Sequence, residues 1–315
     1  MERRVTLSPE ELRLHLAEGV LAFPATPFTA GLALDEPALA RHVADLAAAG
    51  PLALVPAGGA GELFSLSPAE HATVVAATVR GAGAIPVIAG VGGSLAIATD
   101  MARAAERAGA TGILLLPPYL ITPDQEGLGT YAEYVCRAVG IGVIVYSRDN
   151  GVFAPATVAR LADRNANLIG LKDGTGDFET LLALKRDFAD RLALINGVPT
   201  AEMTARQCFA IGIRAYSSAV FSFLPGLALA FFRAARDGDT AVADRLMNEF
   251  YLPLVQLRRR RAGYAVSIIK AGLRAVGKPA GPVRPPLVDL TPQEEEELRK
   301  LIANARDLTD KEAPR

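Results

Sequence analysis

The sequence LIGLKDGTGD, residues 168–177, carries an apolar strand directly into a glycine-rich loop, with Lys172 where the strand ends. Burying an unpaired ammonium group is costly, so a buried lysine has a lowered pKa. A neutral amine can attack a carbonyl carbon. Lys172 is therefore a candidate Schiff-base nucleophile, and the alternative is a surface lysine that pairs with Asp173.

Seven further apolar runs resemble the strand that leads to Lys172. The eight runs span residues 20–28, 52–57, 86–91, 112–117, 142–147, 168–172, 192–196 and 214–219. Each is continuous rather than alternating, which is typical of parallel strands covered on both faces. The helical patterns between them include residues 36–49, 68–80, 96–108 and 155–162. Eight strand–helix units predict an α/β fold of the (β/α)8 TIM barrel type. The alternative, an open doubly wound sheet, usually has a fingerprint loop after its first strand, and none follows Phe28.

Two helical segments flank the predicted barrel. Residues 1–18 predict an extra N-terminal helix, residues 19–236 the barrel, and residues 237–315 a C-terminal helical extension packed on it. Helical patterns in that extension lie near residues 240–261, 264–276 and 292–305. We therefore expect one barrel with a C-terminal helical layer.

Composition narrows the class of protein. Half of the 315 residues are apolar and the formal net charge is −1, which disfavours a nucleic-acid or membrane-surface partner. The basic run Arg258–Arg261 is the local exception, and we expect it to form a solvated or subunit-facing edge. No run is long enough to span a membrane, and no signal peptide is evident. With two isolated cysteines, these features predict a cytoplasmic protein.

In barrels of this kind the chemistry lies at the carboxyl ends of the strands. The three histidines, His15, His42 and His71, all fall on predicted helices instead. Glu62 is the one carboxylate placed as a strand-end ligand, and a lone carboxylate rarely holds a metal. We therefore expect no metal site.

Three groups at or just beyond the strand ends suit substrate binding and proton transfer. The loop Gly58, Gly59, Ala60 and Gly61 can turn its amide groups inward as a nest for a carboxylate, or it is a plain turn. Tyr146, one strand before Lys172, is placed to move protons, or it is a packed aromatic. Arg148 either forks a substrate carboxylate or pairs with Asp149.

The order of these motifs resembles the dihydrodipicolinate synthase / N-acetylneuraminate lyase superfamily over roughly residues 18–305. The similarity rests on GGAGE at residues 58–62, Tyr119 followed by QEG at residues 125–127, Tyr146 and Lys172. Longer motifs are similar to the branch that dehydrates sugar diacids: YSRDN at residues 146–150, KDGTGD at 172–177, YSSAVF at 216–221 and GYAVS at 263–267. The synthase branch would carry a second tyrosine where Leu120 stands.

The resemblance implies a Schiff-base lyase that needs no cofactor. Lys172 would form an imine with the ketone of a six-carbon keto-deoxy sugar diacid, Tyr146 would shuttle protons, and the glycine-rich loop would bind the adjacent carboxylate. Loss of water and CO2 would give 2,5-dioxopentanoate. The remaining substrate-binding candidates are Tyr119, Arg148, Asn150, Gly197, Ser217 and Ser218. Relatives of this kind are commonly dimers or tetramers, which implies a homo-oligomer.

Two positions depart from the family pattern. Ala60 stands where a threonine or serine is usual, and Ser147 where an asparagine is expected, so we expect slower turnover or altered specificity. Two alternatives stay open: an aldolase of the same superfamily that releases pyruvate, and a catalytically silent barrel that binds a keto acid, which Ala60 favours.

Overall fold

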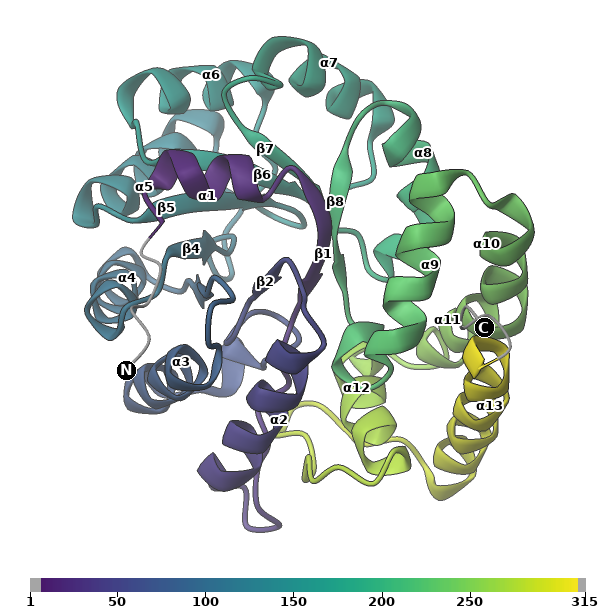
Figure 1. Ribbon diagram of the computed structural model, residues 1–315. Helices are drawn as coiled ribbons and strands as arrows, with labels where there is room; N and C mark the ends of the chain where they lie inside the picture. The colour runs from purple at the N-terminus through teal and green to yellow at the C-terminus, as the bar shows by residue number, and fades with distance from the viewer. Residues whose placement is uncertain (1–6, 311–315) are drawn as a thin grey trace.

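The computed structural model describes residues 7–310, and its centre is an eight-stranded parallel barrel (Figure 1). The strands are β1 Glu18–Ala22, β2 Ala53–Leu54, β3 Ile88–Val91, β4 Gly112–Leu115, β5 Gly142–Ser147, β6 Leu168–Asp173, β7 Ala193–Asn196 and β8 Arg214–Ser218. Neighbours follow the order β2-β1-β8-β7-β6-β5-β4-β3. A single bridge between Leu54 and Val87 closes the remaining gap between β2 and β3. The predicted barrel is therefore confirmed, and the open sheet is excluded.

A ring of helices covers the outside of the barrel. These are α2 Glu36–Ala48, α3 Pro68–Gly81, α4 Leu95–Ala108, α5 Gln125–Ala138, α6 Pro155–Arg164, α7 Phe178–Phe188, α8 Ala205–Ala210 and α9 Pro225–Asp237. Helix α3 begins as its sequence predicts, because Ser67 and Glu70 form a capping box around Pro68. Short 3-10 helices, η1 Leu63–Ser65, η2 Ala201–Thr204 and η3 Val220–Ser222, follow strands β2, β7 and β8.

Helix α1, Pro9–His15, lies across the amino-terminal end of the barrel (Figure 1). Its residue Leu12 is fully buried among the side chains that fill the barrel interior. A Cβ atom at Gly112 or Gly142 would lie 2.9 or 3.1 Å from the Leu12 Cδ2 atom, so a larger residue at either strand start would crowd the Leu12 side chain. This end of the barrel is plugged, which leaves the carboxyl ends of the strands for chemistry. The helix is shorter than predicted, and residues 1–6 lie outside the described residues.

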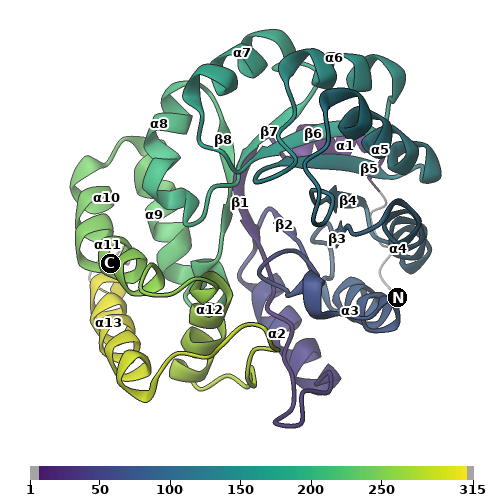
Figure 2. The same cartoon turned by 180° about the vertical axis from the view of Figure 1, so that it is seen from behind.

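The C-terminal residues form a helical layer beside α9 (Figure 2). It consists of α10 Thr240–Leu246, the π-helical turn η4 Met247–Tyr251, α11 Leu252–Arg258, α12 Tyr264–Ala275 and α13 Pro292–Asp310. The stretch predicted as one helical pattern over residues 240–261 is thus interrupted by a π turn. Arg258 is half-buried and donates a hydrogen bond to Thr200 Oγ1 at 2.5 Å, whereas Arg259 to Arg261 are exposed. Across residues 7–310, no helix has the length and apolar character needed to cross a bilayer.

Candidate active site

Strands β5 and β6 place Tyr146 directly beside Lys172. The two residues are Cα partners in the parallel ladder. The register shifts between Val143 and Ile144, so that Ile169 is an extra residue in β6. A bulge of this kind re-aims the side chains that follow it. Here the shift brings the lysine and the tyrosine to the same side of the sheet, at the end of the barrel that α1 leaves open.

Lys172 is buried, with 4% of its surface exposed. Its Nζ atom lies 3.6 Å from the centre of the Tyr146 ring and 5.5 Å from that of Phe23, and it donates a hydrogen bond to the Gly197 carbonyl oxygen at 3.1 Å. Burial lowers the pKa of the lysine, although the nearby Tyr146 opposes the effect. Asp173 is no ion-pair partner, since its carboxylate accepts hydrogen bonds from the backbone and side chain of Thr175 and from Gly176 N. The surface-lysine alternative is therefore wrong.

The Tyr146 hydroxyl lies between two partners. It donates to the Gly197 carbonyl oxygen at 2.8 Å and accepts from Arg148 Nη1 at 3.2 Å. Burial alone would raise the pKa of this phenol, but the positive charges of Lys172 and Arg148 outweigh it and lower the pKa. Arg148 also pairs with Asp149 at 2.7 Å, so one guanidinium serves both the tyrosine and the surface acid.

Gly197 holds the acceptor that Lys172 and Tyr146 share. Its amide donates to the Asp173 carbonyl oxygen at 2.6 Å, which fixes the loop after β7 against β6. A Cβ atom at this position would lie 2.5 Å from both Cγ and Nζ of Lys172. Only glycine leaves room for the lysine here. Gly174 is similar, because a Cβ there would lie 2.9 Å from Tyr146 Cε2.

The glycine-rich loop follows β2 at the same end of the barrel. Gly58 packs on the Phe23 ring, whose centre is 5.5 Å from Lys172 Nζ. Thr26 Oγ1 donates to the Gly61 carbonyl oxygen at 2.7 Å. Within residues 7–310, the amide groups of residues 58–61 donate to no protein acceptor. Four unused amides, in a loop that packs through Gly58 on the ring near Lys172, can receive an anion such as a carboxylate.

The other candidates at the mouth divide into fixed and available groups. Asn150 Nδ2 donates to the carbonyl oxygens of Pro118 (2.6 Å) and Ile121, so its amide tethers the loop after β4. Tyr119, in that loop, is exposed. Ser217 is half-buried.

Ser218 faces away from the available groups. It is fully buried, donates to Glu202 Oε1 at 2.5 Å and accepts from Phe221 N at 3.1 Å. Glu202 is itself 1% exposed, and burial raises its pKa from 4.5 to about 7. The Ser218 hydroxyl is thus committed to the fold.

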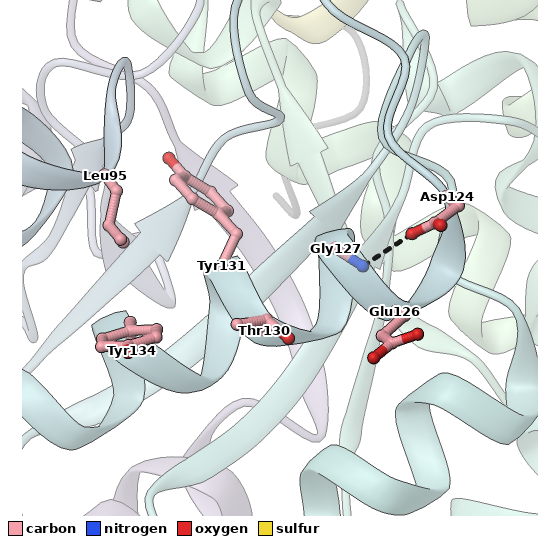
Figure 3. Close-up of a pocket in the computed structure, with 7 residues that line it drawn as sticks. All are labelled: Leu95, Asp124, Glu126, Gly127, Thr130, Tyr131 and Tyr134. Carbon is pink, nitrogen blue, oxygen red and sulfur yellow. Dashed lines mark hydrogen bonds between the residues drawn. The ribbon is translucent and has the colours of Figure 1, made fainter.

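A separate surface hollow of about 470 Å³ lies along α5 (Figure 3). Its lining residues are Leu95, Asp124, Glu126, Gly127, Thr130, Tyr131 and Tyr134. The Asp124 carboxylate in this hollow caps the helix by accepting from Gly127 N at 2.7 Å. Neither Lys172 nor Tyr146 lines it, so the candidate site is the lysine–tyrosine pair and not this hollow.

The described residues include no cluster of three or more His, Cys, Asp or Glu side chains arranged to hold a metal ion. Glu62, the one carboxylate considered for that role, is fully buried and pairs with Lys270 Nζ at 2.6 Å. Sequence reasoning missed Phe23 as a site residue, and it did not predict that Gly174 packs against Tyr146. Gly174 lies inside the motif that includes Lys172, whereas Phe23 lies unmarked in an apolar run.

Fold and site together define a (β/α)8 barrel protein with a buried lysine at the carboxyl end of the sixth strand and a tyrosine beside it on the fifth. The chain matches the Dihydrodipicolinate synthetase family over residues 16–305, and it belongs to that family. The resemblance inferred from the motifs is thereby confirmed.

Two relatives illustrate the match in sequence. A protein of Rhizobium rhizogenes strain K84 is 49% identical over 300 residues, covering 95% of this chain and 99% of the relative. One of Saccharopolyspora erythraea is 51% identical over 295 residues, covering 93% and 96%. Both are named "Probable 5-dehydro-4-deoxyglucarate dehydratase".

Solved structures agree on the fold. A dihydrodipicolinate synthase from Oceanobacillus iheyensis, 24% identical, superimposes with a TM-score of 0.86 over 95% of this chain and 99% of its own. A prophage protein of the dihydrodipicolinic acid synthase family from E. coli K12, solved in complex with pyruvate, is 26% identical. Its TM-score is 0.83, over 92% of this chain and 99% of its own.

Proposed function

We propose that this chain is a 5-dehydro-4-deoxyglucarate dehydratase that works through a Schiff base on Lys172. The observation that carries the proposal is the pairing of Lys172 with Tyr146 on one shared acceptor, the Gly197 carbonyl oxygen. The names of relatives at 49% and 51% identity supply the substrate.

In the first step, the amine of Lys172 attacks the ketone carbon of the substrate. Burial lowers the pKa of this lysine and so favours the neutral, nucleophilic form. The carbinolamine then loses water to give an imine between Nζ and the former ketone carbon. The protonated imine withdraws electrons from the adjacent CH2 group and acts as the electron sink for the later steps.

Tyr146 is the proton carrier in this account. Its hydroxyl donates to the same Gly197 carbonyl oxygen as Lys172 Nζ, and the neighbouring positive charges lower its pKa, so the phenol exchanges protons more readily than a free tyrosine. Arg148 Nη1, which donates to the tyrosine oxygen, stabilises the phenolate form. This contact partly offsets the absence of a hydroxyl at Ala60.

The remaining bonds break in a fixed order. Loss of a proton from the CH2 group gives an enamine, which expels the β-hydroxyl as water. The distal carboxylate then leaves as CO2, and its bonding electrons enter the conjugated imine. Protonation and hydrolysis release 2,5-dioxopentanoate and restore the amine of Lys172.

The substrate has a carboxylate at each end. We assign the ketone-side carboxylate to the unused amides of residues 58–61. Arg148 and Ser217, with Tyr119, are our candidates for the distal, hydroxyl-bearing end. Asn150 acts indirectly, because it holds the loop that carries Tyr119. Ser218 supports the site from the buried side of β8, where its hydroxyl is bonded to Glu202.

A product assay tests the reaction. Incubation with 5-dehydro-4-deoxyglucarate should release CO2 and 2,5-dioxopentanoate in equal amounts. Pyruvate as the product would favour the aldolase alternative instead, for which the pyruvate-bound relative is the supporting observation. Binding without turnover would favour the silent barrel. A homo-oligomeric state and a cytoplasmic location stay predictions of the sequence.

A further inference from the structure

We infer that the buried ion pair between Glu62 and Lys270 positions the glycine-rich loop for the substrate carboxylate. Both side chains are fully buried, and Lys270 Nζ lies 2.6 Å from Glu62 Oε1. The glutamate directly follows the loop at residues 58–61, whereas the lysine comes from α12 in the C-terminal layer. A buried pair that joins elements so distant in sequence is a fixed point from which the loop can be oriented.

The backbone at Glu62 transmits this anchor to the loop. Glu62 has a left-handed conformation with φ 57°, which a residue with a side chain adopts at a cost. The Glu62 amide donates to the Gly59 carbonyl oxygen at 3.2 Å. The Leu63 amide donates to the Gly58 carbonyl oxygen, also at 3.2 Å. A Cβ atom at Gly61 would lie 2.8 Å from Ala57 N, so the loop backbone is packed too closely there to shift freely. Moving the Glu62 side chain would therefore move the amides of the loop.

The C-terminal segment completes the anchor. Arg284 N donates to Glu62 Oε2 at 3.0 Å, and Lys270 Nζ donates to the Pro282 carbonyl oxygen at 2.7 Å. Lys270 Nζ and the Arg284 guanidinium also both contact the Phe28 ring, each 4.0 Å from its centre. Both carboxylate oxygens of Glu62 are thus held from the layer that follows the barrel.

The buried pair is poorly explained by stability alone. Removing two charges from water usually offsets most of their attraction, and apolar residues of similar volume can replace such pairs without loss. The position that the pair gives to the glycine-rich loop explains the two buried charges better than stability does. This inference rests on the proposed function, because it assigns the loop to the ketone-side carboxylate.

The test compares two probes of equal size on the full-length chain. Pyruvate carries the carboxylate, and pyruvamide replaces it with an uncharged amide. Borohydride trapping of the Lys172 adduct, followed by intact mass, gives a rate for each probe. In the Lys270→Met variant, the ratio of the trapping rate with pyruvate to that with pyruvamide should fall about tenfold. The trapping rate with pyruvamide alone should change by less than about threefold. If the wild type does not trap pyruvamide, the half-saturating pyruvate concentration should rise about tenfold at an unchanged limiting rate.

A matched control comes from the same region. Lys278 pairs with Asp45 at 2.9 Å, but both side chains are partly exposed, and Lys278→Met should keep the wild-type preference. Should Lys270→Met fail to fold, the double variant Glu62→Gln/Lys270→Met removes both charges and should show the same loss of preference. Equal loss for both probes, or no change, would overturn the positioning role. Absence of any wild-type adduct would instead overturn the proposed function itself.

Discussion

Tyr146 and Lys172 are partners in the β5–β6 ladder, and both donate a hydrogen bond to the carbonyl oxygen of Gly197. The lysine nitrogen lies 3.6 Å from the centre of the tyrosine ring. One backbone oxygen therefore holds both side chains in place. Each group shifts the pKa of the other, which makes the pair a unit rather than two independent residues.

The Gly197→Ala substitution should block imine formation. The new methyl group would lie 2.5 Å from Lys172 Nζ and Cγ, so the lysine would be displaced from Tyr146. We expect trapping of pyruvate to fall by roughly a hundredfold or more, since misplacement by about 1 Å is that costly. Gly226→Ala is the matched control, because a Cβ there meets nothing within 4 Å. An adduct formed at the wild-type rate would contradict the shared-acceptor geometry.

Replacing Arg148 by methionine should move the pH dependence of turnover. Arg148 helps to lower the pKa of Tyr146, so its loss raises that pKa. If the phenolate is the working base, the rising limb of kcat against pH shifts to higher pH. Measurements at saturating substrate across the pH range check this, and Arg148→Lys, which keeps the charge, should shift the limb less. A rising limb that stays in place would show that Arg148 does not act through the tyrosine.

Ala60→Thr should speed turnover of the sugar diacid. The added hydroxyl would give Tyr146 a hydroxyl group with which it can exchange a proton. One such hydrogen bond changes rates by about tenfold. The Ala60→Val variant has the same shape without the hydroxyl and should not gain. An unchanged rate for the threonine variant would mean that Gly197 and Arg148 already suffice for the relay.

Glu202 should make the fold less stable as the pH rises. Burial raises its pKa from 4.5 to about 7, so the folded state holds a proton that the unfolded chain releases. Its contribution is fully present below pH 4.5 and is lost as the pH rises through about 7, by up to about 3 kcal/mol.

The Glu202→Gln substitution should remove this dependence. The variant should unfold at a higher temperature than the wild type at pH 8 and show a smaller change in midpoint between pH 5 and pH 8. Exposed Glu126, changed to glutamine, serves as the control. An unchanged pH dependence in the Glu202 variant would show that this carboxyl is ionised in the folded protein.

The sequence predicts the barrel well because its strands are continuous apolar runs, and chain order fixes which strands are neighbours. It also predicts Lys172 and Tyr146, since both stand at strand ends. The bulge at Ile169, which brings them into register, has no local signature. Apolar runs do not fix where a strand ends. The run over residues 20–28 predicts a strand that extends to Phe28, whereas β1 ends at Ala22.

The outer parts of the site depend on tertiary contacts that a single sequence does not reveal. Ser217 and Ser218 look equivalent in the chain, but alternation along β8 turns one toward the mouth and buries the other against Glu202. In the sequence, Glu62 has the position of a strand-end acid. In the structure it pairs with Lys270 of α12, which lies 208 positions later in the chain. Partners at such separation follow from the fold and not from spacing.

Intact mass after borohydride reduction tests the Schiff base most directly. The wild type would be incubated with 5-dehydro-4-deoxyglucarate or with pyruvate, beside Lys172→Ala and the exposed-lysine control Lys300→Ala. We predict an adduct in the wild type and in the control, none in Lys172→Ala, and an adduct mass that reports whether water and CO2 have left. No adduct with either compound, or an adduct that persists in Lys172→Ala, would contradict the mechanism.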